Sequence, residues 1–229
     1  MKSLIGLGGI LFATSPALKA EIDSEIPLGI EAVTGIRSHY VHRGFQLANS
    51  SLDFQLEAEV TLSNDTSLHL GLSHLAESEG DFSETTGYLE LGHSFTKQFT
   101  LGTTMTYLDR DAGILDSGLD LGIFSSFSID DNWLWRNELN FDFSENGIYL
   151  ASELEWSHVI SDKSFVTIKG GLSYVSDYLD RDGLNDFYAR VAFTYALSDQ
   201  VSFTPFFGTS FQLDASDVSF GGLSFEVIF

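Results

Sequence analysis

Apolar and polar residues alternate along most of this chain, most clearly from Leu52 to Leu62. In that segment every odd-numbered residue is polar, and every even-numbered residue is apolar. Successive side chains of a β-strand point to opposite faces, so a strand here has one apolar face and one charged face. A helix would mix the two sets of side chains. The segment is therefore predicted to be a strand.

Similar alternation predicts about twelve strands and no helix, with 10 or 14 strands as alternatives. Most segments have the roughly 9–11 residues that a tilted membrane strand needs. A soluble β-sandwich would also alternate, so the turns and the two faces must separate these fold classes. The predicted strands cover residues 29–43, 51–62, 66–76, 86–96, 98–108, 117–129, 132–143, 147–160, 164–176, 185–197, 200–213 and 217–229.

The connections sort by length. Those after even-numbered strands are tight, and most of those after odd-numbered strands are longer: 44–50, 77–85, 109–116 and 177–184. Two odd-numbered ones, 144–146 and 214–216, are short. Short turns at one end and longer loops at the other are typical of outer-membrane barrels, with both termini on the side of the short turns.

Aromatic residues on the apolar face also sort by position. They gather near both ends of the predicted strands, and aliphatic residues such as Leu56, Leu70 and Leu139 lie between them. Two aromatic girdles around an aliphatic band mark the interfaces of a membrane barrel. The residues expected near the tight turns are Phe95, Phe99, Phe127, Trp133, Trp156, Tyr195, Phe203 and Phe229, and those near the longer loops are Tyr40, Tyr107, Phe143, Tyr174, Phe187 and Phe211.

The ends of the chain support the same fold class. The last strand, Leu223 to Phe229, resembles the terminal aromatic strand by which the insertion machinery recognises bacterial outer-membrane barrels. The beginning has a positive residue, a short apolar run and small residues, which indicates a secretory signal within residues 1–20. Cleavage is expected after Ala17 or Ala20. Residues 21–229 then form one transmembrane, antiparallel, up-and-down β-barrel in the outer membrane.

Composition narrows the function. The formal net charge of -22 opposes nucleic-acid binding, which depends on Lys and Arg at phosphates. The absence of cysteine removes disulfides and thiolate chemistry. Aromatic residues make up 14% of the chain, which opposes disorder. No cofactor is expected.

The polar face of each strand should line the lumen, because charged side chains need water or an opposite charge. The lumen is then either a narrow aqueous pore or a plug of ion-paired side chains. Inward glycines such as Gly71 and Gly171 would leave room, or would mark bends in the strands. The charged lumen candidates are Arg37, Arg43, Glu57, Glu59, Glu90, Arg136, Glu138, Glu153, Glu155, Lys169 and Arg190, with Glu31, Asp53, Asp120, Asp142 and Glu226 as further acids.

Neighbouring strands suggest ion pairs among these candidates. Arg37 and Arg43 are expected to neutralise the pair formed by Glu57 and Glu59. Arg136 and Lys169 are expected beside the second acidic pair, which is Glu153 and Glu155. Acids still exceed bases, which favours cations in a pore.

The first hairpin carries a family resemblance. Ser38, Tyr40, Val41, Arg43 and Gly44 match an S-x-Y-V-x-R-G stretch, and the chain thereby resembles the TorF-like family of small outer-membrane porins. The resemblance extends over the first two strands. It implies a small barrel and a porin role, and it assigns no binding residues.

Three functions remain open. The first is a channel for passive diffusion of small solutes, with a preference for cations. The second is a structural or adhesive barrel that does not conduct, and the third is a lipid- or peptide-processing enzyme. No G-x-S-x-G or H-E-x-x-H motif supports catalysis, although histidines at 39, 42, 69 and 74 are expected near the lumen or its rim. The sequence leaves the solute and the oligomeric state open.

A calcium site is a further hypothesis. Asp180, Asp182 and Asp186 could supply oxygen ligands for Ca²⁺, although the full EF-hand pattern is absent. The alternative is an acidic loop in contact with solvent.

Overall fold

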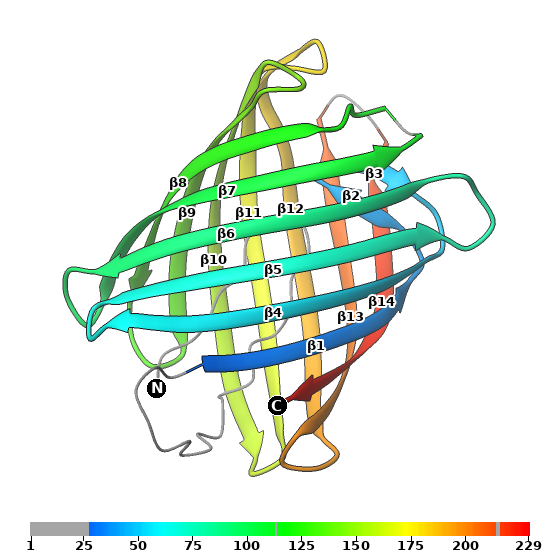
Figure 1. The fold of residues 1–229 in the computed structure, drawn as a ribbon. Coiled ribbons are helices and arrows are strands. Elements are labelled where there is room, and N and C mark those ends of the chain that lie inside the picture. Colours follow the sequence, from blue (N-terminus) through cyan, green and yellow to red (C-terminus); the bar gives the residue numbers. More distant parts are fainter. Residues whose placement is uncertain (1–27, 113, 214–215) are drawn as a thin grey trace.

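Twelve antiparallel strands close into one barrel in the computed structural model, which describes residues 28–112, 114–213 and 216–229 (Figure 1). The expected signal at residues 1–20 lies outside this described part. The barrel strands are β1 (Leu28–Arg37), β4 (Ser51–Ser63), β5 (Thr66–Glu77), β6 (Ser83–Ser94), β7 (Phe99–Asp111), β8 (Gly118–Ser128), β9 (Trp133–Asp142), β10 (Gly147–Ser161), β11 (Ser164–Tyr178), β12 (Arg181–Ala196), β13 (Val201–Gln212) and β14 (Val218–Ile228).

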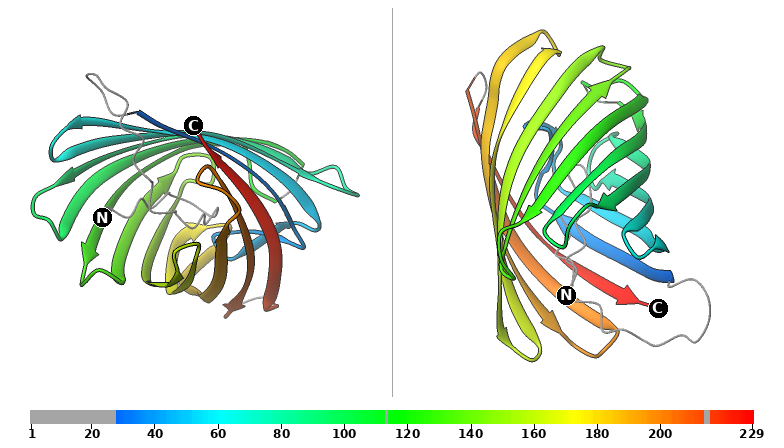
Figure 2. Two further views of the ribbon diagram at one scale, coloured as in Figure 1. Left: turned by 90° about the horizontal axis from the view of Figure 1, so that it is seen from below. Right: turned by 90° about the vertical axis from the view of Figure 1, so that its left-hand side faces the viewer.

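The barrel strands follow one another in chain order, and β1 pairs with β14 to close the barrel. The two views of Figure 2 show the strands tilted around one enclosed space, with the C-terminus beside the start of β1. This confirms the predicted up-and-down, twelve-stranded barrel. The described part of the chain contains no helix long and apolar enough to cross a membrane.

The first predicted strand is wrong at its end. It was expected to run from 29 to 43, but β1 ends at Arg37. The chain then forms a separate two-stranded hairpin from β2 (Tyr40–His42) and β3 (Phe45–Ala48). The connection expected at 177–184 is also much shorter. There β11 continues to Tyr178 and β12 begins at Arg181.

The two faces of each strand have the environments that the alternation predicts. On β4, Leu52, Phe54 and Leu56 are 56%, 53% and 44% exposed, whereas Asp53 and Gln55 are buried. The apolar face therefore points outward and the charged face points into the lumen. This arrangement is the reverse of a soluble protein and suits a barrel surrounded by lipid.

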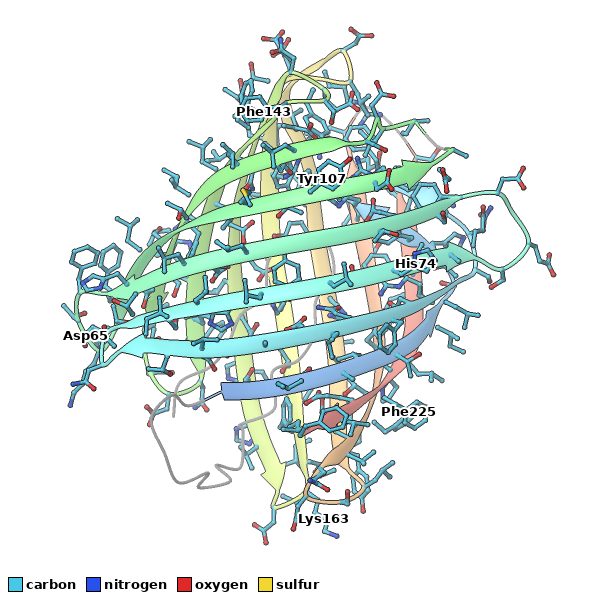
Figure 3. All side chains as sticks on the ribbon, viewed as in Figure 1. Asp65, His74, Tyr107, Phe143, Lys163 and Phe225 are labelled. Atoms are coloured by element: carbon cyan, nitrogen blue, oxygen red, sulfur yellow. The ribbon has the colours of Figure 1, made fainter. Side chains whose placement is uncertain are left out.

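Aromatic side chains project from both ends of the barrel exterior. Figure 3 shows Tyr107, Phe143 and Phe225 pointing outward from the wall. Trp133 and Phe95 are also exposed, near the tight turns. The prediction that Tyr40 belongs to the outer girdle is wrong. Tyr40 lies in the hairpin and is almost completely buried.

The closed wall predicts heat-modifiable migration in electrophoresis. A closed barrel has no free strand edge, so dodecyl sulfate should not unfold it until the sample is boiled. Unboiled, refolded protein should migrate differently from boiled protein. Equal migration of both samples, with folding verified by circular dichroism, would contradict a stable barrel.

Candidate functional site

The hairpin β2–β3 lies inside the barrel, near the end with the longer connections. Its turn is formed by Arg43 and Gly44, with φ angles of 50° and 82°. Positive φ at both central residues is the geometry of a type I′ hairpin turn. Gly44 adopts it freely, but a non-glycine residue such as Arg43 rarely does. Contacts of the Arg43 side chain therefore help to hold this turn.

Apolar contacts seat the hairpin between two walls. On one side, Tyr40 and Ala48 pack with Leu75 and Phe82, at the connection between β5 and β6. On the other side, Phe45 contacts a second buried cluster. This cluster contains Leu115, Tyr149, Ala151, Val175 and Tyr178. The hairpin thus reaches across the lumen from β1 and β4 to the walls on both sides.

Polar contacts fix the hairpin tip to the distant wall. The Arg43 guanidinium forms ion pairs with Asp120 and Asp142, and it donates to the Tyr178 hydroxyl at 3.3 Å. The main chain is also held, because the Asn185 amide donates to the carbonyl of Arg43 at 2.9 Å. The Gln212 amide donates to the carbonyl of Gly44. Side chains from β8, β9, β11, β12 and β13 therefore converge on the two turn residues.

His42 occupies an unusual place in this hairpin. Its side chain is 4% exposed, and neither ring nitrogen has a hydrogen-bond partner among the described residues. Burial, together with the nearby guanidinium groups of Arg110 and Arg43, lowers the pKa of His42 well below its usual value. The imidazole is therefore neutral at physiological pH. His42 also contributes to the lining of the cavity between the hairpin and the barrel wall.

Ion pairs connect the inner faces of the strands below and around the hairpin. Arg136 pairs with Glu90 at 2.8 Å and with Glu138 at 2.6 Å. Lys169 pairs with Glu153 at 3.3 Å and with Glu155 at 2.9 Å. The expected contact of Lys169 with the second acidic pair is thus present. Arg136 is directly opposite Glu153 in the register of β9 and β10, as expected, although its ion pairs are with Glu90 and Glu138.

The expected neutralisation of Glu57 and Glu59 is wrong. Arg37 pairs with Asp53, and Arg43 pairs with acids on the opposite wall. Glu59 instead lies 3.5 Å from His69. Glu57 is directly opposite Glu31 in the register of β1 and β4, so this part of the lumen gathers carboxylates.

The sequence prediction missed a buried pair, Glu84 and Arg110. Their side chains meet at 2.6 Å, and the Tyr40 hydroxyl donates to Glu84 at 2.6 Å. Both residues lay in segments assigned to loops, although β6 begins at Ser83 and β7 runs to Asp111. Glu84 and Arg110 continue the inward register of Thr86 and Leu108, which could have revealed them.

Aromatic rings cover five inward glycines, so the expectation that these glycines leave open space is wrong. Each glycine is directly opposite an inward aromatic residue on the next strand, and a Cβ atom would collide with the ring. Two of these rings also lie under guanidinium groups, with Arg136 over Phe124 at 4.1 Å and Arg190 over Phe206 at 4.2 Å. The pairs are Gly71–Tyr88, Gly102–Phe124, Gly171–Tyr188, Gly208–Phe220 and Gly222–Phe206.

A cavity of about 160 Å³ remains between the hairpin and the barrel wall. Its lining combines both signs of charge with aromatic rings such as Tyr88 and Tyr188. Among the charged candidates from the sequence, the cavity touches Arg37, Arg43, Arg136, Glu138, Glu153 and Arg190. Glu90 and Lys169 lie next to it through their ion pairs with Arg136 and Glu153, and Glu155 pairs in turn with Lys169.

The histidines and the proposed calcium ligands do not gather into one centre. His74 is exposed and contacts Thr85, whereas His42 is in the hairpin. Asp186 is buried against Ser173 and Ser210, but the exposed Asp182 accepts from Ser176. Residues 28–112, 114–213 and 216–229 contain no group of three or more histidine, aspartate or glutamate side chains placed to hold a metal ion.

No protein-family model matches this chain, and no curated protein matches it. The resemblance to the TorF-like family therefore stays a prediction.

Solved structures do match. The outer membrane channel COG4313 from Pseudomonas putida F1 is 10% identical, with a TM-score of 0.62 and coverage of 92% of this chain and 99% of that one. The KdgM porin is 8% identical, with a TM-score of 0.56 and coverage of 87% and 98%. LpxR from Salmonella typhimurium is 9% identical, with a TM-score of 0.56 and coverage of 88% and 100%. At these identities the likeness concerns the fold, so the chain has the closed β-barrel architecture of bacterial outer-membrane proteins.

Proposed function

We propose that this protein is a narrow outer-membrane channel for passive diffusion of small solutes, with a preference for cations. The observation that carries the proposal is the charged interior, which retains a cavity beneath a hairpin that narrows one end. Charged side chains on the inner wall need water or counter-charges, and a channel supplies both. We assign no catalytic role to the dispersed histidines. Phe229 is the proposed recognition residue for the insertion machinery.

The preference for cations rests on the distribution of acids. Within the lumen, many carboxylates are offset by arginine or lysine, but Glu31 and Glu57 face each other. The rim with the longer connections adds more acids, whereas its bases Arg110 and Arg181 are buried and half-buried. Exposed rim acids are Glu79, Asp81, Asp109, Asp111, Asp116, Asp177, Asp180, Asp182 and Asp217. An acidic entrance above a low-dielectric wall concentrates cations.

The structural neighbours support a channel function, but they do not identify a particular solute. One structure is described as the KdgM porin in complex with disordered oligogalacturonate, at a TM-score of 0.57 and 11% identity. Oligogalacturonate is anionic, and the acidic rim described above would repel it. We therefore propose neutral or cationic small solutes for this chain.

Replacing Glu153 and Glu155 together by glutamine should lower the cation-to-anion permeability ratio. The change removes two negative charges from the lumen and leaves the Lys169 ammonium without its counter-charges. The ratio is measured from the reversal potential of refolded protein in a planar bilayer with a salt gradient. Asp65→Asn with Asp162→Asn is the matched control, because it removes the same charge at two tight turns. Figure 3 labels Asp65 at the first turn and Lys163, which follows Asp162, at the second.

Two results would count against the proposal. An unchanged ratio in a conducting Glu153→Gln, Glu155→Gln variant would remove the role of this pair. Anion selectivity of the native protein would refute the cation preference.

A barrel that does not conduct is the second candidate, because the hairpin and its ion pairs fill much of the lumen at one end. The same bilayer experiment separates the two functions. Absence of conductance in native protein and in a variant without residues 40–48, both shown to be folded and inserted, would favour a structural or adhesive role.

A further inference from the structure

Two half-buried carboxylates on the inner wall have no counter-charge. Glu31 on β1 and Glu57 on β4 are directly opposite each other, which places their Cβ atoms about 5 Å apart. Within the described part of the chain, neither forms an ion pair with lysine, arginine or histidine. The acids that do have a basic partner are Asp53, Glu59, Glu84, Glu90, Asp120, Glu138, Asp142, Glu153 and Glu155.

The Tyr88 side chain extends over a glycine toward this pair. Glu57, Gly71 and Tyr88 occupy one row across β4, β5 and β6. A Cβ atom on Gly71 would collide with the ring, so the ring lies directly over this glycine, and its hydroxyl forms a hydrogen bond with Glu57. No guanidinium of the described residues lies over this ring, in contrast to the rings of Phe124 and Phe206. The Tyr88 ring is therefore open to a cation.

A buried amide adds an acceptor that the barrel does not use. Gln55 precedes Glu57 by two positions on β4, so both side chains point inward, and Gln55 is 3% exposed. Its side-chain nitrogen donates to the Tyr88 hydroxyl at 3.4 Å, whereas its Oε1 has no hydrogen-bond partner among the residues that the structure describes. An acceptor buried without a donor costs free energy. This part of the wall thus has an excess of acceptors and of negative charge.

From this arrangement we infer that the inner wall of β1, β4, β5 and β6 binds the ammonium group of a small organic amine. An alkylammonium group has one positive charge and three N–H donors, which match the carboxylates of Glu31 and Glu57 and the amide oxygen of Gln55. The face of the Tyr88 ring attracts the same cation. The cavity beneath the hairpin touches Gln55 and Tyr88, so it has room for the organic part of the amine.

Other classes of solute fit these groups less well. An anion is repelled by the two carboxylates, and a neutral solute leaves both of them without a counter-charge. A metal ion needs several oxygen ligands placed around one point. Over residues 28–112, 114–213 and 216–229, no three acidic or histidine side chains are placed in that way. The inference rests on the proposed channel function for the passage of the amine, and it names the class of cationic solute.

Calorimetry on refolded protein in detergent tests the site without requiring conductance. The probe is n-butylammonium chloride, and n-butanol is its neutral control of similar size. Native protein should bind butylammonium and not butanol. Glu31→Gln combined with Glu57→Gln should weaken this binding by about tenfold or more, because two charge-assisted hydrogen bonds are lost. Asp65→Asn combined with Asp162→Asn removes the same charge at tight turns and should bind as native protein does.

Two further variants test the ring while both carboxylates remain. Tyr88→Leu should weaken butylammonium binding several-fold, whereas Tyr88→Phe retains the ring face and should bind more tightly than Tyr88→Leu. Heat-modifiable migration verifies that each variant is folded. Equal binding by these two variants would remove the ring from the site.

The inference is overturned if native protein does not bind butylammonium, if butanol binds equally well, or if the double glutamine variant binds as native protein does. It is also overturned if calcium chloride displaces the amine at a lower concentration than the amine itself requires, because the site is then a metal site. Conductance in planar bilayers separates this inference from the proposed function. Binding without conductance would refute the channel alone, and conductance without binding would refute the amine site alone.

Discussion

Arg43→Ala is expected to lower the free energy of unfolding by roughly 3–5 kcal/mol, because it leaves two buried carboxylates without their counter-charge. Those carboxylates belong to Asp120 and Asp142, which are 3% and 1% exposed. The same change releases the tip of the hairpin, so conductance through the barrel should rise. Unfolding in urea is followed by tryptophan fluorescence in lipid vesicles, and conductance is measured in planar bilayers.

Two companion variants make this result specific. Lys97→Ala removes a positive charge from an exposed tight turn and should change stability by less than about 0.5 kcal/mol. Combining Arg43→Met with Asp120→Asn and Asp142→Asn should recover much of the lost stability, since no buried charge is then left alone. A loss below about 1 kcal/mol for Arg43→Ala would show that the hairpin is not held by this residue.

Leu56→Arg is expected to destabilise the barrel by roughly 2–4 kcal/mol, because a charged group then faces the hydrocarbon near the middle of the membrane. Its neighbour Glu57 points into the lumen beside Glu31, so Glu57→Gln should cost much less or should stabilise by removing repulsion. Both variants are compared by urea unfolding in vesicles of one lipid. Large losses of similar size in both would mean that the two residues do not occupy opposite faces.

The wall of the barrel could be predicted because the alternation within each strand shows which side chains face lipid and which face the lumen. Alternation on β4 assigns Leu56 and Glu57 to opposite faces without knowledge of any other strand. Cross-strand neighbours follow from the order of strands, which is why the contact between Lys169 and Glu155 was anticipated. These two residues are directly opposite in the register of β10 and β11.

The hairpin is difficult to predict because only part of its local sequence departs from the pattern of β1. Tyr40 keeps the outward spacing of Ile36, so it was placed in the girdle, although Ser38 and His42 on the same face are polar. The inward turn depends on partners far away in sequence: Arg43 meets Asp142, which is 99 residues further along the chain. Contacts across the lumen also depend on barrel curvature. This explains why Arg37 was assigned to the wrong acids, since it pairs with Asp53.

The position of the hairpin has a consequence for assembly in the cell. It follows β1, so it is synthesised before every strand that holds its tip. The wall around it is complete only when β14 pairs with β1, at the opposite end of the chain. Docking of Arg43 therefore requires a nearly finished protein, and access to this residue from solvent should report how far closure has progressed. A reagent that modifies residue 43 only when it is exposed to solvent would distinguish a stalled insertion intermediate from the mature barrel.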